Sequence, residues 1–188
     1  RALAKATGEW VLSIDADERI TAELQQEIKQ TITHATYTAC RMPRKSQYCG
    51  RWIKHSGWTP DFVTRLFRRD CARFSDDIIH EKVQVLHGEI GTLKRPLLHY
   101  SFSSLEEVLE KINSYSSVNA YKHFEQGKTA SLSKAIFHGL WSFVRTYLLR
   151  AGFLDGREGF MLAISNAEGT YYRYIKLMYL QENRQTDR

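Results

Sequence analysis

A short apolar run that ends at three carboxylates constrains the fold of this chain more than any other feature. Residues 10–14 read Trp-Val-Leu-Ser-Ile after a glycine, which predicts a buried β-strand. Asp15, Asp17 and Glu18 follow at once, and Thr21 then predicts the N-cap of a helix. Apolar residues recur behind Thr21 at four-residue spacing: Leu24, Ile28 and Ile32. This order indicates an α/β fold, in which ligands bind beyond the carboxyl ends of strands.

The rest of the chain divides near residue 101. Before it lie five β-type runs, at residues 37–42, 48–53, 62–67, 83–86 and 97–100. After it the pattern becomes helical, and the first helix begins at a capping box formed by Ser103 with Glu106 or by Ser104 with Glu107. Gly127 predicts its end, and two further helices are predicted over residues 131–150 and from Gly156 to about residue 180. The pattern therefore predicts a sheet domain over residues 1–100 and a helical region over residues 101–188.

Composition excludes several classes of protein. With 188 residues and 43% apolar content, the chain can bury one sizeable core and an appendage. Its three cysteines lack CxxC spacing, which favours reduced thiols in a cytoplasmic protein over a disulfide framework or a zinc site. No apolar stretch reaches the roughly 18 residues of a membrane span. We expect a cytoplasmic protein, or one that rests on a membrane surface.

A basic segment is the main feature of the charge distribution. Residues 41–73 contain nine Lys and Arg residues but only two aspartates. Such a segment favours a phosphorylated partner through its local field, although a solvated surface would produce the same pattern. One interpretation of the chain is therefore a non-catalytic basic module that binds nucleic acid or anionic lipid.

The acidic corner indicates a different chemistry. Two aspartates separated by one residue offer hard oxygen ligands that suit Mg²⁺ or Mn²⁺ on a diphosphate, as in the departure of a nucleotide from a sugar. A surface loop is the alternative, with Glu18 favouring the dipole of the next helix. An EF-hand fits poorly, because Arg19 and Ile20 follow where further oxygen ligands and a glycine are needed.

An ordered set of sequence blocks resembles one known family. The blocks are ATGEWVLSIDADE (residues 6–18), GRWIKHSGWTPDFVTRLFRR (50–69), IIHEKV (78–83), LLHYSFSSLEEVLEKINSYS (97–116) and LRAGFLDGREGF (149–160). Together they resemble the family-2 GT-A glycosyltransferases, and most of all the lipopolysaccharide-core β-glucosyltransferase type. The resemblance implies the C-terminal portion of a GT-A (Rossmann-like) mixed sheet followed by a helical appendage.

The resemblance also implies an activity. Members are metal-dependent inverting hexosyltransferases, and this branch moves glucose from UDP-glucose onto the lipopolysaccharide inner core at the inner face of the bacterial inner membrane. Residues 1–6 read as the last turns of a helix that Gly8 stops, so we expect the chain to begin inside a domain. The uridine-contacting half would then lie upstream, which leaves open whether this segment alone is active. No nucleic-acid partner is expected under this interpretation.

Site residues follow by matching positions to the family pattern. The resemblance implies Glu81 as the base that deprotonates the acceptor hydroxyl, with Asp77 and then Asp76 in reserve. Metal or diphosphate contacts fall on Asp15, Asp17 and His99. Donor or acceptor contacts fall on six further residues: Lys54, Trp58, Arg65, His80, Lys111 and Tyr115. Each has a plainer alternative, such as a salt bridge for Arg65, a packing role for Lys111 and Tyr115, and a core histidine for His99.

The predicted helix over residues 131–150 is amphipathic. Lys134, His138 and Arg145 share one narrow face of a helical wheel, and an apolar arc lies beside them. The arc consists of Ile136, Phe137, Leu140, Phe143, Val144, Tyr147 and Leu148. Either this helix rests on an anionic membrane leaflet, or its apolar arc docks on the body of the protein.

Overall fold

The computed structural model describes residues 3–34, 36–75 and 82–186 of the chain. It divides into two compact units. Unit 1 comprises Arg1–Ser46 and Pro60–Ser101, and unit 2 comprises Gln47–Thr59 and Phe102–Arg188. Unit 2 therefore includes a segment, Gln47–Thr59, that lies well before the predicted change of character near residue 101.

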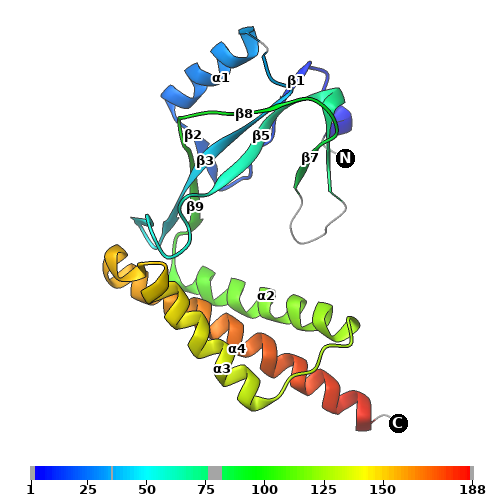
Figure 1. Cartoon of the computed structure of the whole chain (residues 1–188), viewed down its shortest axis with the longest axis vertical. Helices are drawn as coiled ribbons and strands as arrows, with labels where there is room; N and C mark the ends of the chain where they lie inside the picture. Colours follow the sequence, from blue (N-terminus) through cyan, green and yellow to red (C-terminus); the bar gives the residue numbers. More distant parts are fainter. Residues whose placement is uncertain (1–2, 35, 76–81, 187–188) are drawn as a thin grey trace. The chain divides into compact units, whose positions relative to one another are not determined.

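Unit 1 is built on a mixed sheet with one helix (Figure 1). The strands run in the order β1-β5-β3-β9-β2, and β8 also pairs with β3. Pairing is antiparallel between β1 and β5, β3 and β5, and β2 and β9, whereas β8 lies parallel to β3. Their bounds are β1 Trp10–Leu12, β2 Glu18–Ile20, β3 Ala39–Tyr48, β5 Phe62–Arg68, β8 Ile90–Thr92 and β9 Leu97–Phe102. The mixed sheet confirms the predicted α/β class.

Helix α1 (Ala22–His34) closes the main core of unit 1. Thr21 caps it as predicted, because its hydroxyl accepts the backbone N–H of Leu24 at 3.1 Å. Leu24 and Ile28 are the buried residues of this helix, and they pack against the sheet through four strand residues: Cys40, Met42, Leu66 and Leu97. Smaller elements complete the unit: the hairpin of β6 (Ala72–Phe74) and β7 (Val83–Val85), and 3-10 turns at Leu3–Lys5 and Arg69–Cys71.

One strand prediction was wrong in part, and strand β8 was not predicted. The run predicted over residues 48–53 is divided by a turn: β3 continues to Tyr48, and the chain reverses at Cys49 (φ 46°) and Gly50 (φ 86°) into the short strand β4 (Arg51–Trp52). Strand β8, which contains Gly91, lies outside the five predicted runs. A tyrosine ring explains the glycine there, since a Cβ at Gly91 would overlap the side chain of Tyr37. Neither strand pairing is visible in local sequence periodicity.

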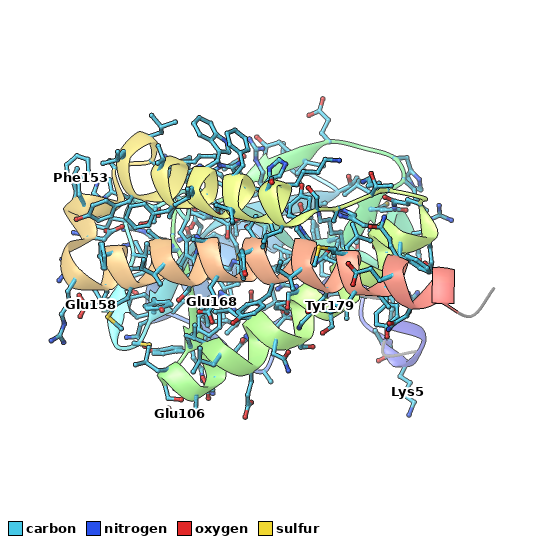
Figure 2. The ribbon with its side chains drawn as sticks, turned by 90° about the horizontal axis from the view of Figure 1, so that it is seen from below. Lys5, Glu106, Phe153, Glu158, Glu168 and Tyr179 are labelled. Carbon is cyan, nitrogen blue, oxygen red and sulfur yellow. The ribbon has the colours of Figure 1, made fainter. Side chains whose placement is uncertain are left out.

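Unit 2 consists mainly of three helices, α2 (Leu105–Glu125), α3 (Leu132–Val144) and α4 (Gly156–Thr186), with α4 between the other two (Figure 2). The predicted boundaries are confirmed: Ser104 accepts the N–H of Glu107, and Gly127 follows the end of α2 at φ 69°. Helix α3 continues as a π-helical turn, η3 (Arg145–Leu149), and a 3-10 turn, η4 (Gly152–Asp155), leads into α4.

Helix α3 packs through its small residues. Ala135 and Gly139 are buried, and a Cβ on Gly139 would meet Tyr171 of α4 at 3.3 Å. Four of the seven residues of the predicted apolar arc are instead exposed: Ile136, Phe137, Leu140 and Leu148. Within the described ranges, no helix combines the length and the apolar character needed to cross a membrane.

Candidate functional site

The acidic corner is a tight turn between β1 and β2. The N–H of Glu18 donates to the carbonyl of Asp15 at 3.0 Å, and the N–H of Asp15 donates to Oε2 of Glu18 at 3.0 Å. Because β2 pairs with β9, Glu18 stands opposite His99 in the sheet. Two segments that lie about 80 residues apart in sequence thus meet here, and the corner includes His99 as well as the three carboxylates.

Arg65 of β5 is the cation of this corner. Its Nη2 donates to Oε1 of Glu18 at 2.7 Å and also to Oδ2 of Asp15. Burial alone would lower the pKa of Arg65, but the hydrogen bonds and charges of Glu18 and Asp15 raise it. Glu18 is only 1% exposed, and its second cation, Arg44, lies 3.5 Å away. Arg65 therefore makes the salt bridge that was the alternative to phosphate binding.

Asp17 and His99 form a second pair beside this ion pair. Their Oδ2 and Nε2 atoms lie 3.3 Å apart, and the other ring nitrogen of His99 lies 2.9 Å from the hydroxyl of Ser46 and 2.8 Å from that of Ser101. Burial lowers the pKa of His99, and the charge of Arg44 lowers it further, against the opposing effect of Asp17. The side chain of Asp17 is 38% exposed and that of His99 is 16% exposed, so the carboxylate is the more accessible group of the pair.

The three predicted metal ligands are not arranged alike. Asp17 faces His99, whereas Asp15 faces Arg65. In the part of the chain that the structure describes, no group of three or more His, Cys, Asp or Glu side chains could hold a metal ion. Mg²⁺ is commonly bound through one or two carboxylates together with substrate phosphates and water, and Asp17 is the partly exposed carboxylate of that kind here, whereas imidazole is not a typical Mg²⁺ ligand. Glu81, Asp77, Asp76 and His80 lie outside the described residues.

A pocket of about 270 Å³ lies within unit 2. Three of the predicted binding residues line it together: Trp58, Lys111 and Tyr115. Trp58 stacks on Phe102 with ring centroids 6.2 Å apart, and the Nζ of Lys111 lies 4.7 Å from the centroid of the same Phe102 ring. Tyr48 completes the aromatic wall, with its hydroxyl 2.9 Å from that of Ser165. Lys54 is not among the lining residues, and Arg65 belongs to unit 1.

Asp155 holds the loop that carries Trp58. Its carboxylate is buried and accepts the backbone N–H of Lys54 at 3.0 Å and that of His55 at 2.9 Å. It also accepts the hydroxyl of Ser56 at 3.2 Å. The loop needs such support, because Ser56 has φ 59°, a left-handed conformation that is unusual for a residue with a side chain. The block at residues 149–160 therefore shapes the loop before Trp58.

Sequence reasoning missed Asp155 and Arg173 as residues of this region. Arg173 of α4 lines the pocket, and its Nε is buried without a hydrogen-bond partner among the described residues. An arginine in an aromatic-rich helix was a weak signal, since most such residues are solvated. Asp155 lay inside a quoted block, but local sequence could not reveal the loop it contacts about 100 residues away.

Most arginines of the basic segment are paired with acids. Arg44 pairs with Asp61, Arg68 with Glu9, Arg69 with Asp70 and Arg51 with Glu158, in addition to the Arg65 pair. These carboxylates come partly from outside the segment, which the local charge count did not include. The positive field available to a nucleic acid is accordingly smaller than the sequence suggested.

Sequence comparisons show which known proteins the chain is similar to. No family model matches the chain. It is 31% identical over 180 residues to an uncharacterized glycosyltransferase of Rickettsia prowazekii and 30% identical over 183 residues to one of Rickettsia typhi, covering 90% and 92% of this chain. It is also 29% identical over 184 residues, or 94% of its length, to the lipopolysaccharide core biosynthesis glycosyltransferase LpsC of Rhizobium meliloti. The matches span 62%, 63% and 66% of these three relatives.

Proposed function

Because the relatives that match nearly all of this chain are named glycosyltransferases, we propose that it is part of an enzyme that transfers a sugar from a nucleotide-sugar donor to an acceptor hydroxyl. The observation that supports this most is the Asp17–His99 pair at the acidic corner, with the neighbouring ion pair of Glu18 and Arg65. The pair combines a carboxylate from the turn between β1 and β2 with an imidazole from β9. The carboxylate suits a Mg²⁺ or Mn²⁺ ion on a diphosphate, and the imidazole suits a hydrogen bond to the diphosphate.

In this proposal the residues of the corner have different roles. Asp17 and His99 bind the diphosphate of the donor. A bound Mg²⁺ or Mn²⁺ would neutralise negative charge on that diphosphate. Glu18 and Arg65 stabilise the turn, because their side chains form an ion pair with each other. Glu81 is the proposed general base for an inverting transfer, with Asp77 in reserve.

The acceptor and donor are proposed on the family resemblance and on one relative. LpsC carries lipopolysaccharide core biosynthesis in its name. With the family resemblance, that name supports the lipopolysaccharide inner core as the proposed acceptor of this chain, and the resemblance alone supports UDP-glucose as the donor. The reaction would form a bond between the sugar's anomeric carbon and the acceptor oxygen, and release UDP with the acceptor's proton passing to the base.

A membrane surface is the proposed location of this reaction. Residues 131–154 contain Lys134, Arg145 and Arg150 but no aspartate or glutamate. Large apolar side chains are exposed along the same stretch, including Phe137 at 65% and Leu140 at 64%, and Phe153 projects outward near the start of α4 (Figure 2). Apolar side chains beside unopposed cations match an anionic lipid surface, on which such a helix would lie in the plane of the headgroups.

Vesicle sedimentation tests this location. The complete protein is expected to sediment with vesicles that contain phosphatidylglycerol more than with phosphatidylcholine alone, and Leu140→Glu is expected to reduce the bound fraction about tenfold. Leu109→Glu is the control, since Leu109 is a similarly exposed leucine of α2. Equal loss in both variants, or no vesicle binding by the complete protein, would remove the membrane proposal. Self-association that Leu140→Glu abolishes would identify a second copy of the chain as the partner instead.

Donor binding tests the transfer function. In the complete protein, UDP-glucose with Mn²⁺ is expected to raise the thermal unfolding temperature, because a ligand that binds only the folded state stabilises it. Asp17→Ala should lose this protection. Glu81→Gln should keep the protection but lose transfer by about 100-fold or more.

Two other outcomes would count against these assignments. Transfer at near wild-type rate in Glu81→Gln would exclude Glu81 as the base and direct attention to Asp77. Tight, steeply salt-dependent binding of DNA or RNA that survives Asp17→Ala would support the basic-module alternative. Because the paired arginines of residues 41–73 reduce the free positive charge, we expect no such binding.

A further inference from the structure

We propose that a second pocket of unit 2 binds a phosphate group through the ammonium groups of Lys128 and Lys134 and the imidazoles of His123 and His138. The pocket has a volume of about 470 Å³ and is lined by residues of α2, α3 and α4 and of the loop between α2 and α3. All of these residues belong to unit 2, so the site is formed within one compact body. Phosphate binding here does not require the proposed transfer function.

Positive charge gathers in this pocket. Its lining residues that the structure describes include two lysines and two histidines but no aspartate or glutamate. Within the described ranges, neither Lys128 nor Lys134 forms an ion pair with a carboxylate. An ammonium group has three donors, and the Nζ of Lys134 donates one of them to the carbonyl of Thr129 at 3.4 Å. Donors therefore remain for an anion, which would also relieve the repulsion between the two cations.

His123 reports the electrostatic field at the pocket. Burial lowers the pKa of its imidazole, and the charges of Lys128, Arg173 and Lys122 lower it further. Among the described residues, the charged groups that shift this pKa are all cations. A nearby carboxylate would act in the opposite direction. The field at the imidazole is therefore positive, as binding of a phosphate requires.

The first turn of α3 adds to this field. A helix N-terminus carries partial positive charge, which favours aspartate or glutamate in the first turn. The first turn of α3 contains no acidic residue, and Lys134 lies there instead. Ser131 caps the helix by accepting the N–H of Lys134 at 3.3 Å. A cation beside the positive end of a helix is unfavourable, and an anion in the pocket would compensate it.

Gln181 of α4 holds the loop that carries Lys128. Its Oε1 accepts the N–H of Ala130 at 3.1 Å, and its Nε2 donates to the carbonyl of Lys128 at 2.9 Å. The ring of His138 stacks on that of Tyr174 with centroids 4.5 Å apart and planes 5° from parallel. The backbone of Lys128 and the ring of His138 are thus fixed before a ligand binds, which reduces the entropy cost of binding.

A phosphate group suits both the chemistry and the size of this pocket. Ammonium and imidazolium groups form charge-assisted hydrogen bonds with phosphate oxygens. The volume of about 470 Å³ lies in the range of small-molecule sites, roughly 300 to 1,000 Å³, and leaves room for a substituent on the phosphate. Two sources supply such a group: a phospholipid headgroup and a soluble phosphate. The exposed Phe137 and Leu140, on which the membrane location rests, do not line the pocket.

Titration of the complete protein with inorganic phosphate tests the site. At constant pH, NMR follows the imidazole C–H resonances of His123 and His138, with His34 of α1 as the internal reference. Phosphate is expected to shift the first two resonances saturably and to leave that of His34 unchanged. Sodium chloride at equal ionic strength should produce no saturable shift, because it only screens charge. Equal shifts in the two salts, or no shift with phosphate, would overturn the proposal.

Variants localise the binding. Lys128→Gln and Lys134→Gln are each expected to weaken inorganic phosphate binding about tenfold, and Lys128→Arg, which keeps the charge, should retain most of it. Arg145→Gln removes the same charge from an exposed residue that follows α3 and lies outside the lining, so it should have no effect. Melting curves establish that each variant folds. Equal weakening in Arg145→Gln, or unchanged binding in both lysine-to-glutamine variants, would contradict the site.

Vesicles distinguish the two sources of phosphate. The wild type and the double variant Lys128→Gln with Lys134→Gln are sedimented with phosphatidylcholine vesicles that contain or lack phosphatidic acid. A phosphatidic-acid-dependent sedimentation that the double variant loses, together with inorganic phosphate binding, identifies a lipid headgroup. Equal sedimentation of both proteins, or none, identifies a soluble phosphate. Lost sedimentation with intact inorganic phosphate binding would indicate general surface charge and reject the site.

Two further variants separate this proposal from the proposed function. Leu140→Glu and Asp17→Ala should both bind inorganic phosphate as the wild type does, since neither residue lines the pocket. Failure of vesicle binding or of UDP-glucose protection in the wild type would therefore reject the membrane location or the transfer function and leave the phosphate site intact. Loss of phosphate binding in Leu140→Glu would instead place the bound phosphate outside the pocket and reject the proposal.

Discussion

Replacing Arg65 with methionine is expected to lower the free energy of unfolding by about 3 to 5 kcal/mol, the cost of leaving a buried charge without its partner. Glu18 is 1% exposed and accepts from Arg65 at 2.7 Å, whereas its other cation, Arg44, lies 3.5 Å away and is already paired with Asp61. Methionine keeps the length of the side chain but supplies no donor. Urea unfolding of both proteins measures the difference.

The control lies on the same strand. Arg68 of β5 pairs with Glu9, but that carboxylate is largely exposed, so Arg68→Met should cost no more than about 1 kcal/mol. The double variant Glu18→Met with Arg65→Met should recover much of the loss, because it removes both charges together. An Arg65→Met effect as small as that of Arg68→Met would show that Glu18 is not buried as described.

Gly159→Ala is the second substitution with a large expected effect. A Cβ at this position would overlap the backbone carbonyl oxygen of Gly152, and backbone cannot rotate away as a flexible side chain does. We expect a loss of about 2 to 3 kcal/mol, even though alanine favours a helix by about 1 kcal/mol over glycine. The turn η4 would have to move away from α4, and Asp155 would move with it.

Gly169→Ala is the matched control in the same helix. Its Cβ would meet only Ile112, at 3.8 Å, which is an ordinary contact, so helix propensity should make this variant neutral or slightly more stable. Thermal unfolding compares the two variants, and the NMR signal of the Trp58 indole reports on the loop that Asp155 holds. Equal stability of the two alanine variants would contradict the close packing of η4 against α4.

Local sequence was enough for the elements that local forces decide. Thr21 and Ser104 cap their helices because a hydroxyl acceptor satisfies a nearby N–H, and this requires only neighbouring residues. Gly127 ends α2 because glycine tolerates its positive φ. The strand at the start of the acidic corner was likewise visible as an apolar run. The errors fell on strands, such as β8, whose pairing partners lie far along the chain.

The candidate site shows the same division. Sequence placed the three carboxylates of the corner side by side, but the sheet separates them: Glu18 is buried against Arg65, and Asp17 faces His99. Matching of sequence blocks selected Trp58, Lys111 and Tyr115 without showing that they line one pocket. Sequence did not select Arg173, because only the packing of α4 against α2 brings this residue to the same pocket.

Sequence by itself determined the α/β class, the starts of the helices and the presence of three carboxylates at the acidic corner. Tertiary structure alone decided which of these groups meet and which are buried. Helix α3 shows the reason. A period of 3.6 residues reveals its apolar arc, but it does not reveal whether the arc or the small residues face the neighbouring helix. Ala135 and Gly139 are the residues that face inward, because they allow α3 and α4 to approach closely.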